Sequence, residues 1–459
     1  MRKNLLLIFA CAALIPWQSS AGEAEKPPNV IVLIADDAGW RDFGAYGHPN
    51  IKTPSIDKLA QESWLADNAY LTSPQCSPSR ISILSGQYPH QTGTEDLHVP
   101  TPHGAKLLPS YLSEAGYFTG IMRKQHLGEF GSRQFDWQGE DLSLARFLEL
   151  ADDKPFFLWV GFRDPHRDYG DAPKIHSADD IVLPKEHADS AVTRADHVQY
   201  YDEISRMDGA IGTMLEEVDE LGLHDNTYVV FLSDNGAPMP RAKGTLYDAG
   251  IKTPLIVRGP GVAENVRYKS LVSVIDLAPT VLEWAGVEKP VQMIGNSIAA
   301  AMSDPETPGR SYAFSQRDWH NVDEHMRSIR AGRYKLIWNN YVEHPHGSPA
   351  DVSGSPSWLE LRRLRDTGQL NEIQGLLFTA PRPRVELYDL QKDPYEHQDL
   401  AADPANRKIV QRLMRELQFW RQATGDVSPH QRRRDDNTDR TSGVKFSTVK
   451  VPPFLDDND

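Results

Sequence analysis

The sequence predicts an α/β fold in which a large mixed, mostly parallel sheet is flanked by helices and followed by a smaller α+β domain. Two observations support this class. Continuous apolar segments, typical of strands buried on both faces of a parallel sheet, alternate with amphipathic helical segments through most of the chain. Past about Pro308 the pattern changes to successive strands and a closing helix, which indicates a separate α+β unit.

The first expected strand, residues 29–35, is a continuous apolar run that ends in Asp36 and Asp37. Ligands gather at the carboxyl ends of strands in open α/β sheets, and paired carboxylates at such a place suit a hard divalent cation. Asp after a strand is equally typical of a helix N-cap. The pattern by itself leaves both interpretations open.

Helices are expected between the strands. Residues 53–70 predict one, with Pro54 in its first turn and a single apolar face. Another is expected over 79–85, directly after Cys76, and the positive end of its dipole would favour an anion beside residue 76. Further helices are expected over 108–115 and 196–221, and a last strand of the sheet over 254–258.

Four expected strands each end in a cluster of charged or amide side chains. The strands and their clusters are 29–35 with Asp36 and Asp37, 117–122 with Lys124 and His126, 156–162 with His166, and 227–232 with Asp234 and Asn235. Any one cluster is explained by surface exposure. All four at equivalent ends of a parallel sheet, together with Cys76, indicate one functional site.

The first residues predict a secretory signal peptide at 1–21. A short basic start precedes an apolar stretch at 5–16 and the small residues at 19–21, and the stretch is too short to span a membrane. Phe9 stands two residues before Cys11, where a lipoprotein site requires a small side chain. We therefore expect a periplasmic or secreted protein without a membrane anchor.

The formal net charge is -15, and loss of Arg2 and Lys3 with the signal peptide makes it about -17. This charge argues against a nucleic-acid partner, which requires a basic surface. The domains expected are a catalytic one at 22–308, a C-terminal antiparallel sheet with a helix at 309–425, and a tail at 426–459. The long segment 341–382 within the second domain fits a pocket wall or a solvent loop.

Cys76 is the one cysteine outside the predicted signal peptide. A lone thiol in an exported protein cannot form an internal disulfide, although a free cysteine is often a small core residue. The segment Cys76-Ser77-Pro78-Ser79-Arg80 offers another explanation. It matches Cys-x-Pro-x-Arg, the pattern through which the sulfatase family has its cysteine oxidised to formylglycine.

From residue 29 to about 425, the chain resembles type I, formylglycine-dependent sulfatases of the alkaline-phosphatase-like superfamily. The motifs that carry the resemblance are Asp36-Asp37, Cys76-x-Pro-x-Arg80, Lys124-x-His126, Asp164-Pro165-His166, Asp234-Asn235-Gly236 and Lys243-Gly244. The resemblance implies an alkaline-phosphatase-like fold, a sulfated saccharide as substrate and a maturation enzyme that generates the formylglycine.

The resemblance also implies the roles of the site residues. One Ca²⁺ would be held by Asp36, Asp37, Asp234 and Asn235 with the formylglycine at position 76, and oxygen ligands suit calcium. The hydrated aldehyde would supply the nucleophile. Sulfate would be bound by Arg80, Lys124 and Lys243, with His166 as general acid and His126 as base.

Within the family, the segments 162–167, 237–240, 326–329 and 386–389 resemble the heparan N-sulfatase (N-sulfoglucosamine sulfohydrolase) branch. Lys243 departs from it, because that branch carries Arg there, and Arg and Lys are not interchangeable around a sulfate. Both N-sulfates and O-sulfates therefore stay open. The candidates for sugar recognition are His98, His103, Arg163, Arg167, Arg317, His320 and Arg327.

Two other functions fit the same motifs. The first is a phosphonate or phosphate ester hydrolase of the same superfamily, since its members overlap in chemistry. The second is a non-catalytic protein that binds sulfated glycans. The sequence disfavours the second, because a decayed site should have lost at least one of these groups.

Overall fold

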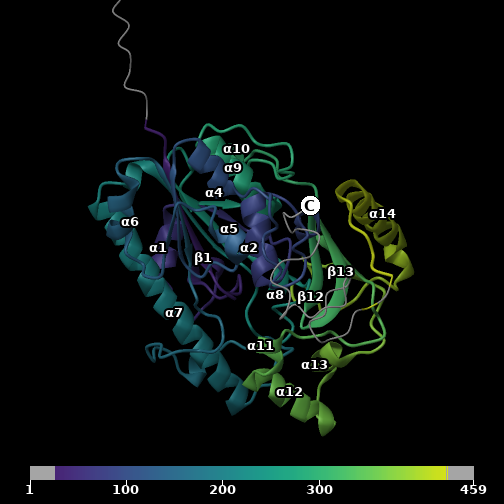
Figure 1. The fold of residues 1–459 in the computed structure, drawn as a ribbon. Coiled ribbons are helices and arrows are strands. Elements are labelled where there is room, and N and C mark those ends of the chain that lie inside the picture. The colour runs from purple at the N-terminus through teal and green to yellow at the C-terminus, as the bar shows by residue number, and fades with distance from the viewer. Residues whose placement is uncertain (1–25, 431, 433–459) are drawn as a thin grey trace, which may run out of the picture.

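The computed structural model describes residues 26–430 and 432. Its centre is an eight-stranded sheet in the order β10-β2-β9-β7-β1-β6-β4-β5 (Figure 1). Among these strands β9 alone runs antiparallel to its neighbours, so the predicted mixed, mostly parallel sheet is confirmed. The strands are β1 (Asn29–Ala35), β2 (Trp64–Ala66), β4 (Phe118–Arg123), β5 (Trp137–Gly139), β6 (Phe156–Gly161), β7 (Thr227–Ser233), β9 (Leu255–Arg258) and β10 (Val266–Tyr268).

Helices cover both faces of this sheet, and β1 shows why. Its alternate side chains Val30, Val32 and Ile34 join one core, whereas the residues between them join the other. On the first face lie α2 (Cys76–Ser85), α4 (Leu108–Glu114), α9 (Leu277–Trp284) and α10 (Ala299–Ser303). On the second face lie α1 (Pro54–Gln61), α6 (Leu144–Ala151) and the long α7 (Ala191–Glu220) (Figure 1). Short helices elsewhere are α3 (Pro89–Thr92), α5 (Gly128–Ser132) and α8 (Asp248–Ile251).

The helix predicted over 53–70 is wrong in its second half. The helix ends at Gln61, and the chain then forms β2 between β9 and β10. Trp64, which the helical pattern placed on an apolar face, is buried in the sheet against Tyr268, with ring centroids 5.0 Å apart. Pairing with two strands distant in sequence overrides the local periodicity here. A small second sheet follows, formed by β3 (Ala69–Tyr70), β8 (Lys252–Thr253) and β11 (Val272–Ser273).

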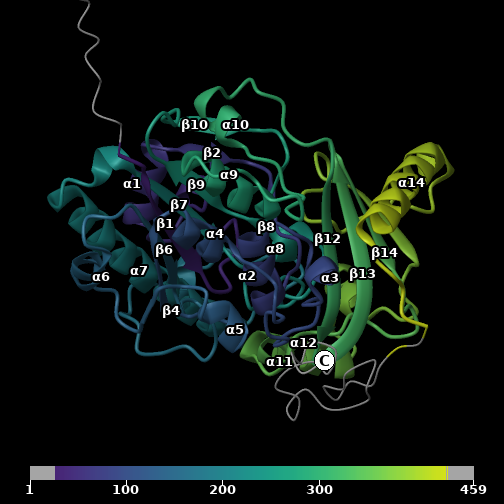
Figure 2. The same cartoon turned by 45° about the horizontal axis from the view of Figure 1, so that its top comes forward.

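The C-terminal part forms a separate four-stranded antiparallel sheet, as predicted. Its strands are β12 (Ala313–His320), β13 (Val322–Ala331), β14 (Tyr334–Asn339) and β15 (Val385–Asp389). The sequence pattern did not reveal β12. Leu413, Leu417 and Trp420 of α14 (Arg407–Thr424) pack on one face, and Tyr70 and Tyr247 pack on the other (Figure 2). This second face ties the sheet to the first part of the chain.

The segment 341–382 carries three helices, α11 (Ala350–Ser353), α12 (Pro356–Asp366) and α13 (Glu372–Gly375). Trp358 and Leu361 of α12 form a small core with Ala188, just before α7. The segment is therefore packed against the first domain. The predicted signal peptide and the predicted tail beyond residue 432 lie outside the described residues. In the part that is described, no helix combines the length and apolar character that crossing a membrane requires.

Candidate active site

The four strands with polar clusters at their ends are neighbours in the sheet, in the order β7-β1-β6-β4, and all run parallel. Their carboxyl ends therefore meet at one edge, as the sequence predicted. Backbone and side-chain contacts join the clusters. The Asp37 amide donates to Asp234 Oδ1 at 3.1 Å, and Asn235 Nδ2 donates to Asp37 Oδ1 at 2.7 Å.

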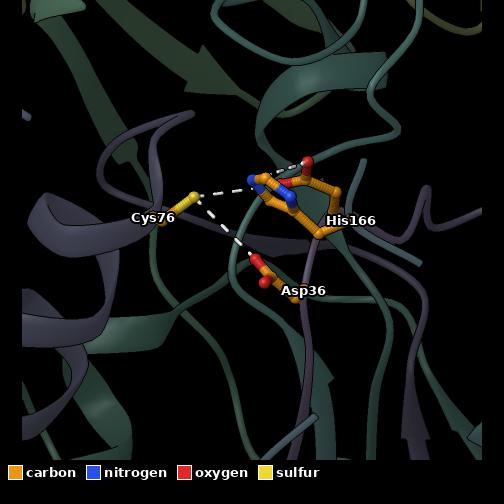
Figure 3. Close-up of side chains that lie close together, drawn as sticks. Asp36, Cys76 and His166 are labelled. Atoms are coloured by element: carbon orange, nitrogen blue, oxygen red, sulfur yellow. Dashed lines mark hydrogen bonds and ion pairs between the residues drawn. The ribbon is translucent and has the colours of Figure 1, made fainter. Parts of the chain in front are cut away.

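Cys76 is the first residue of α2 and reaches the same edge. Its Sγ lies 3.9 Å from one oxygen each of Asp36 and Asp37, and Figure 3 shows it facing Asp36 and His166. The four side chains present ligand atoms within 4.8 Å of one another. Burial raises the pKa of the Cys76 thiol well above its ordinary value. Reactive cysteines have lowered pKa values, so this site does not suit an unmodified thiolate nucleophile.

Three cations surround the carboxylates, and two of them, Arg80 and Lys243, are buried. Arg80 Nε donates to Asp234 Oδ2 at 2.7 Å, and Lys243 Nζ donates to Asp37 Oδ2 at 2.7 Å. Lys124 Nζ pairs with Asp36. Burial opposes the charge of Lys243, but Asp37 keeps its pKa raised well above the ordinary value. The cations are therefore held in fixed positions and stay charged.

Gly161, at the end of β6, allows two of these groups to meet. A Cβ on Gly161 would lie 2.0 Å from the Lys124 carbonyl oxygen and 3.0 Å from Arg80 Nη1. That carbonyl accepts a hydrogen bond from Arg80 Nη1 at 3.2 Å. The neighbour in conflict is backbone, so it cannot simply rotate away.

We therefore expect Gly161→Ala to displace Lys124 and Arg80 and to reduce the activity of this site at least tenfold, with a loss of about 1–3 kcal/mol in folding stability from overpacking. Steady-state kinetics and urea unfolding measure the two effects. Gly209→Ala is the matched control, because no atom lies within 4 Å of the added Cβ. Equal activity of the two variants would contradict this role of Gly161.

The two histidines at the site differ in their contacts. Burial, and then the neighbouring Lys124 charge, lower the pKa of His126 well below its ordinary value, and its Nδ1 has no hydrogen-bond partner among the described residues. His126 is therefore a neutral imidazole that can accept a proton. The Nδ1 of His166 contacts the Arg167 carbonyl, which leaves Nε2 directed toward Asp37 at 3.9 Å.

A pocket of about 680 Å³ opens over this edge of the sheet. Its wall includes Asp36, Lys124, His126 and His166. Sequence reasoning missed a charged residue beside the catalytic groups: Asp351 of α11 accepts a hydrogen bond from Lys243 Nζ at 2.6 Å and lies 3.8 Å from His166 Nε2. No motif or periodicity marks Asp351, because the fold of the segment 341–382 brings it to the site.

Comparison with known proteins identifies the family of this chain. A family model described as Sulfatase matches residues 28–142 and 140–287, which is more than half of the chain. The chain is also 32% identical to human N-sulphoglucosamine sulphohydrolase, over 87% of this chain and 91% of that protein. This chain belongs to the sulfatase family.

Further matches agree with this assignment. A second model, described as N-sulphoglucosamine sulphohydrolase, C-terminal, matches residues 242–377 of the sulfatase. An ulvan-active sulfatase from Formosa agariphila is 29% identical over 87% of this chain and 75% of its own length. A solved structure of a protein with its substrate D-glucosamine-2-N,6-O-disulfate has a TM-score of 0.69 at 20% identity and covers 88% of this chain and 99% of its own. The last match shows the fold alone.

The acidic cluster of the sulfatase has the features of a metal site. Burial, and then the nearby Asp234 charge, raise the pKa of Asp36 to about 6, because the charges of Lys124 and Arg80 only partly offset these two effects. Asn235 Oδ1 is buried in the cluster without a hydrogen-bond partner among the described residues. An orphaned amide oxygen beside three carboxylates is the donor set that a hard divalent cation prefers.

Four of the seven predicted sugar-recognition residues lie at or near the pocket of the sulfatase. Arg163 and Arg167 line the pocket. Arg163 forms an ion pair with Glu140 at 2.8 Å, and Arg167 forms one with Asp196 at 2.6 Å. The His98 ring lies against His126, with centroids 5.0 Å apart. Burial, and then the charge of Lys243, lower the pKa of His320 to about 3.

The other three candidates lie elsewhere. His103 packs against Phe130, with ring centroids 4.9 Å apart, and does not line the pocket. Arg317 is fully buried and donates to the carbonyl oxygens of Gly244 and Gly347. Arg327 is buried between Asp318 and Asp426, with Nη2 2.7 Å from Asp426 Oδ1. Internal partners occupy both guanidinium groups, so we leave Arg317 and Arg327 out of the proposed sugar site.

Proposed function

We propose that this protein is an exported sulfatase that removes sulfate from a sulfated saccharide, with a formylglycine made from Cys76 and one Ca²⁺. One observation carries the proposal: a buried residue 76 at a helix start faces three carboxylates and three cations beneath a pocket. The basic and acidic groups together suit a metal and a sulfate bound side by side. A maturation enzyme would recognise Cys76-x-Pro78-x-Arg80 before folding buries it.

Asp36, Asp37, Asp234 and Asn235 would hold the calcium ion together with residue 76. When present, the ion polarises sulfate oxygens and the hydrated formylglycine supplies a nucleophilic hydroxyl. Arg80, Lys124 and Lys243 bind and orient the sulfate. Their charges also stabilise the negative charge that builds on its oxygens in the transition state.

The two histidines would move the protons. His166 Nε2 faces the pocket because Nδ1 is engaged by the Arg167 carbonyl, so Nε2 can deliver a proton to the leaving atom. His126 is neutral, for the reasons given above, and can take a proton from residue 76 to allow release of sulfate.

Calcium should stabilise the protein. We expect Ca²⁺ at one hundred times its dissociation constant to add about 2.7 kcal/mol to the free energy of unfolding, and chelation to remove both this gain and activity. The rise reflects charge neutralisation of Asp36 and its neighbours. Differential scanning calorimetry with and without Ca²⁺ measures it, and Asn235→Leu, which deletes the orphaned oxygen, should show a reduced shift. Identical melting temperatures with Ca²⁺ and with chelator would contradict a calcium site.

The activity test is sulfate release by protein co-expressed with a formylglycine-generating enzyme. Sulfated glucosamines, sulfated algal oligosaccharides and 4-nitrophenyl sulfate cover the open substrate classes, and 4-nitrophenyl phosphate and a phosphonate monoester cover the alternative chemistry. We expect sulfate-ester or sulfamate turnover to exceed phosphate turnover. Faster phosphate or phosphonate turnover would favour the alternative hydrolase, and tight binding of sulfated oligosaccharides without turnover would favour the non-catalytic protein.

A further inference from the structure

Asp351 is an acidic side chain in a site that is built to bind an anion. Its Oδ2 lies 2.6 Å from Lys243 Nζ and 3.8 Å from His166 Nε2, and the side chain is only 15% exposed. A carboxylate so close to a bound sulfate repels it. The ion pair with Lys243 places Asp351 at the site, and the second contact of the same oxygen, toward His166, lies where a substrate group would leave.

The segment that carries Asp351 is fixed against the catalytic loop. Buried Arg317 donates to the Gly244 carbonyl, next to Lys243, and to the Gly347 carbonyl at 2.6 Å. Gly244 has a φ of 77°, and a Cβ there would lie 2.6 Å from Pro349 Cγ. These contacts hold the start of α11 on the loop of Lys243, so Asp351 is positioned by the backbone.

The position of Asp351 relative to His166 defines what it can contact. A leaving atom that takes a proton from His166 Nε2 lies within hydrogen-bond distance of that nitrogen, and Asp351 Oδ2 is 3.8 Å from the same nitrogen. A leaving atom that lies between the two groups is within hydrogen-bond distance of both. An ester oxygen carries no hydrogen and gains negative charge as it leaves, so Asp351 disfavours it. A sulfamate nitrogen carries a hydrogen to donate.

We propose that Asp351 is a specificity-determining residue that accepts a hydrogen bond from the leaving nitrogen of a sulfamate, so that the pocket prefers N-sulfate to O-sulfate. This rests on the sulfatase function proposed above. The S–N bond breaks with its electron pair on nitrogen, which takes a proton from His166. Overall, the sulfamate and one water give sulfate and an ammonium ion. Asp351 attracts that cation, whereas the alcohol released from an ester carries no charge for Asp351 to attract.

The test compares two substrates that differ only at the leaving atom, D-glucosamine N-sulfate and D-glucose 2-sulfate. In matured wild-type protein, we expect a higher kcat/KM for the N-sulfate. In Asp351→Asn, the ratio of the two kcat/KM values should fall by about 10- to 100-fold, because a charge-assisted hydrogen bond is lost. The O-sulfate rate should stay the same or rise. Glu343→Gln, an exposed position of the same segment, is the matched control and should leave the ratio unchanged.

The outcomes separate this inference from the proposed function. Equal losses on both substrates in Asp351→Asn would show that Asp351 acts only by holding Lys243, and would overturn the specificity role. Wild-type protein that hydrolyses O-sulfates but not the N-sulfate would also overturn it, while leaving the sulfatase proposal intact. No sulfate release from any substrate, with formylglycine confirmed at residue 76, would instead reject the proposed function.

Discussion

Cys76→Ala is expected to abolish sulfate release, with a fall in kcat on the order of 10⁴-fold or more. The substitution removes the only group in the described site that can be converted to the proposed nucleophile. Alanine fits the buried position, so the fold should persist. Sulfate release from the best substrate in the panel, measured on matured wild-type protein and on the variant side by side, gives the result.

Two further measurements, of the fold and of Ca²⁺ binding, distinguish loss of the nucleophile from collapse of the site. The variant should keep the wild-type circular dichroism spectrum and bind Ca²⁺, with somewhat lower affinity because one ligand is missing. Ala38→Gly, a small change at another buried position near the site, serves as a control for packing. Turnover by Cys76→Ala within tenfold of wild type would mean that residue 76 does not supply the nucleophile.

His166→Ala is expected to lower kcat for a saccharide sulfate by roughly 10²- to 10⁴-fold, the usual contribution of general acid catalysis. A sugar hydroxyl is a poor leaving group without a proton. 4-Nitrophenyl sulfate releases a phenolate that is stable near neutral pH, so its turnover should fall much less. The ratio of the two losses, from steady-state kinetics, measures the protonation role directly.

His224→Ala is the matched control, since His224 pairs with Asp219 on the surface beyond α7. It should leave both rates unchanged. Equal losses on both substrates in His166→Ala would show that His166 serves binding or metal coordination, and would remove it as the general acid.

The architecture that positions the site could be predicted from the sequence. The strands predicted at 29–35 and 156–162 carry apolar runs, and the polar cluster that follows each of them marks the sheet edge, whereas the edge strands β5 and β10 have no such run. The prediction of a helix over 53–70 is wrong beyond Gln61. Residues 64–66 form a short apolar segment, and such segments occur in strands as well as in helices. Only pairing with β9 and β10, far away in sequence, decides between the two.

The site could be predicted where a motif spans a strand end and not where tertiary folding supplies the residue. Asp36, Lys124, His166 and Asp234 follow parallel strands, so one rule places them all. Asp351 follows no such strand. Arg317 was a candidate sugar ligand, but it lies in β12, which the sequence pattern did not reveal, and its guanidinium is buried and donates to the backbone carbonyls of Gly244 and Gly347.

The most direct test of the central claim is the mass of the peptide that contains residue 76, from protein co-expressed with a formylglycine-generating enzyme and shown to release sulfate. Conversion of the Cys76 thiol to the nucleophile of this account predicts a peptide about 18 Da lighter than the cysteine form, reactive toward hydrazines, in a fraction that tracks specific activity. Full sulfatase activity with an intact thiol at residue 76 would contradict it.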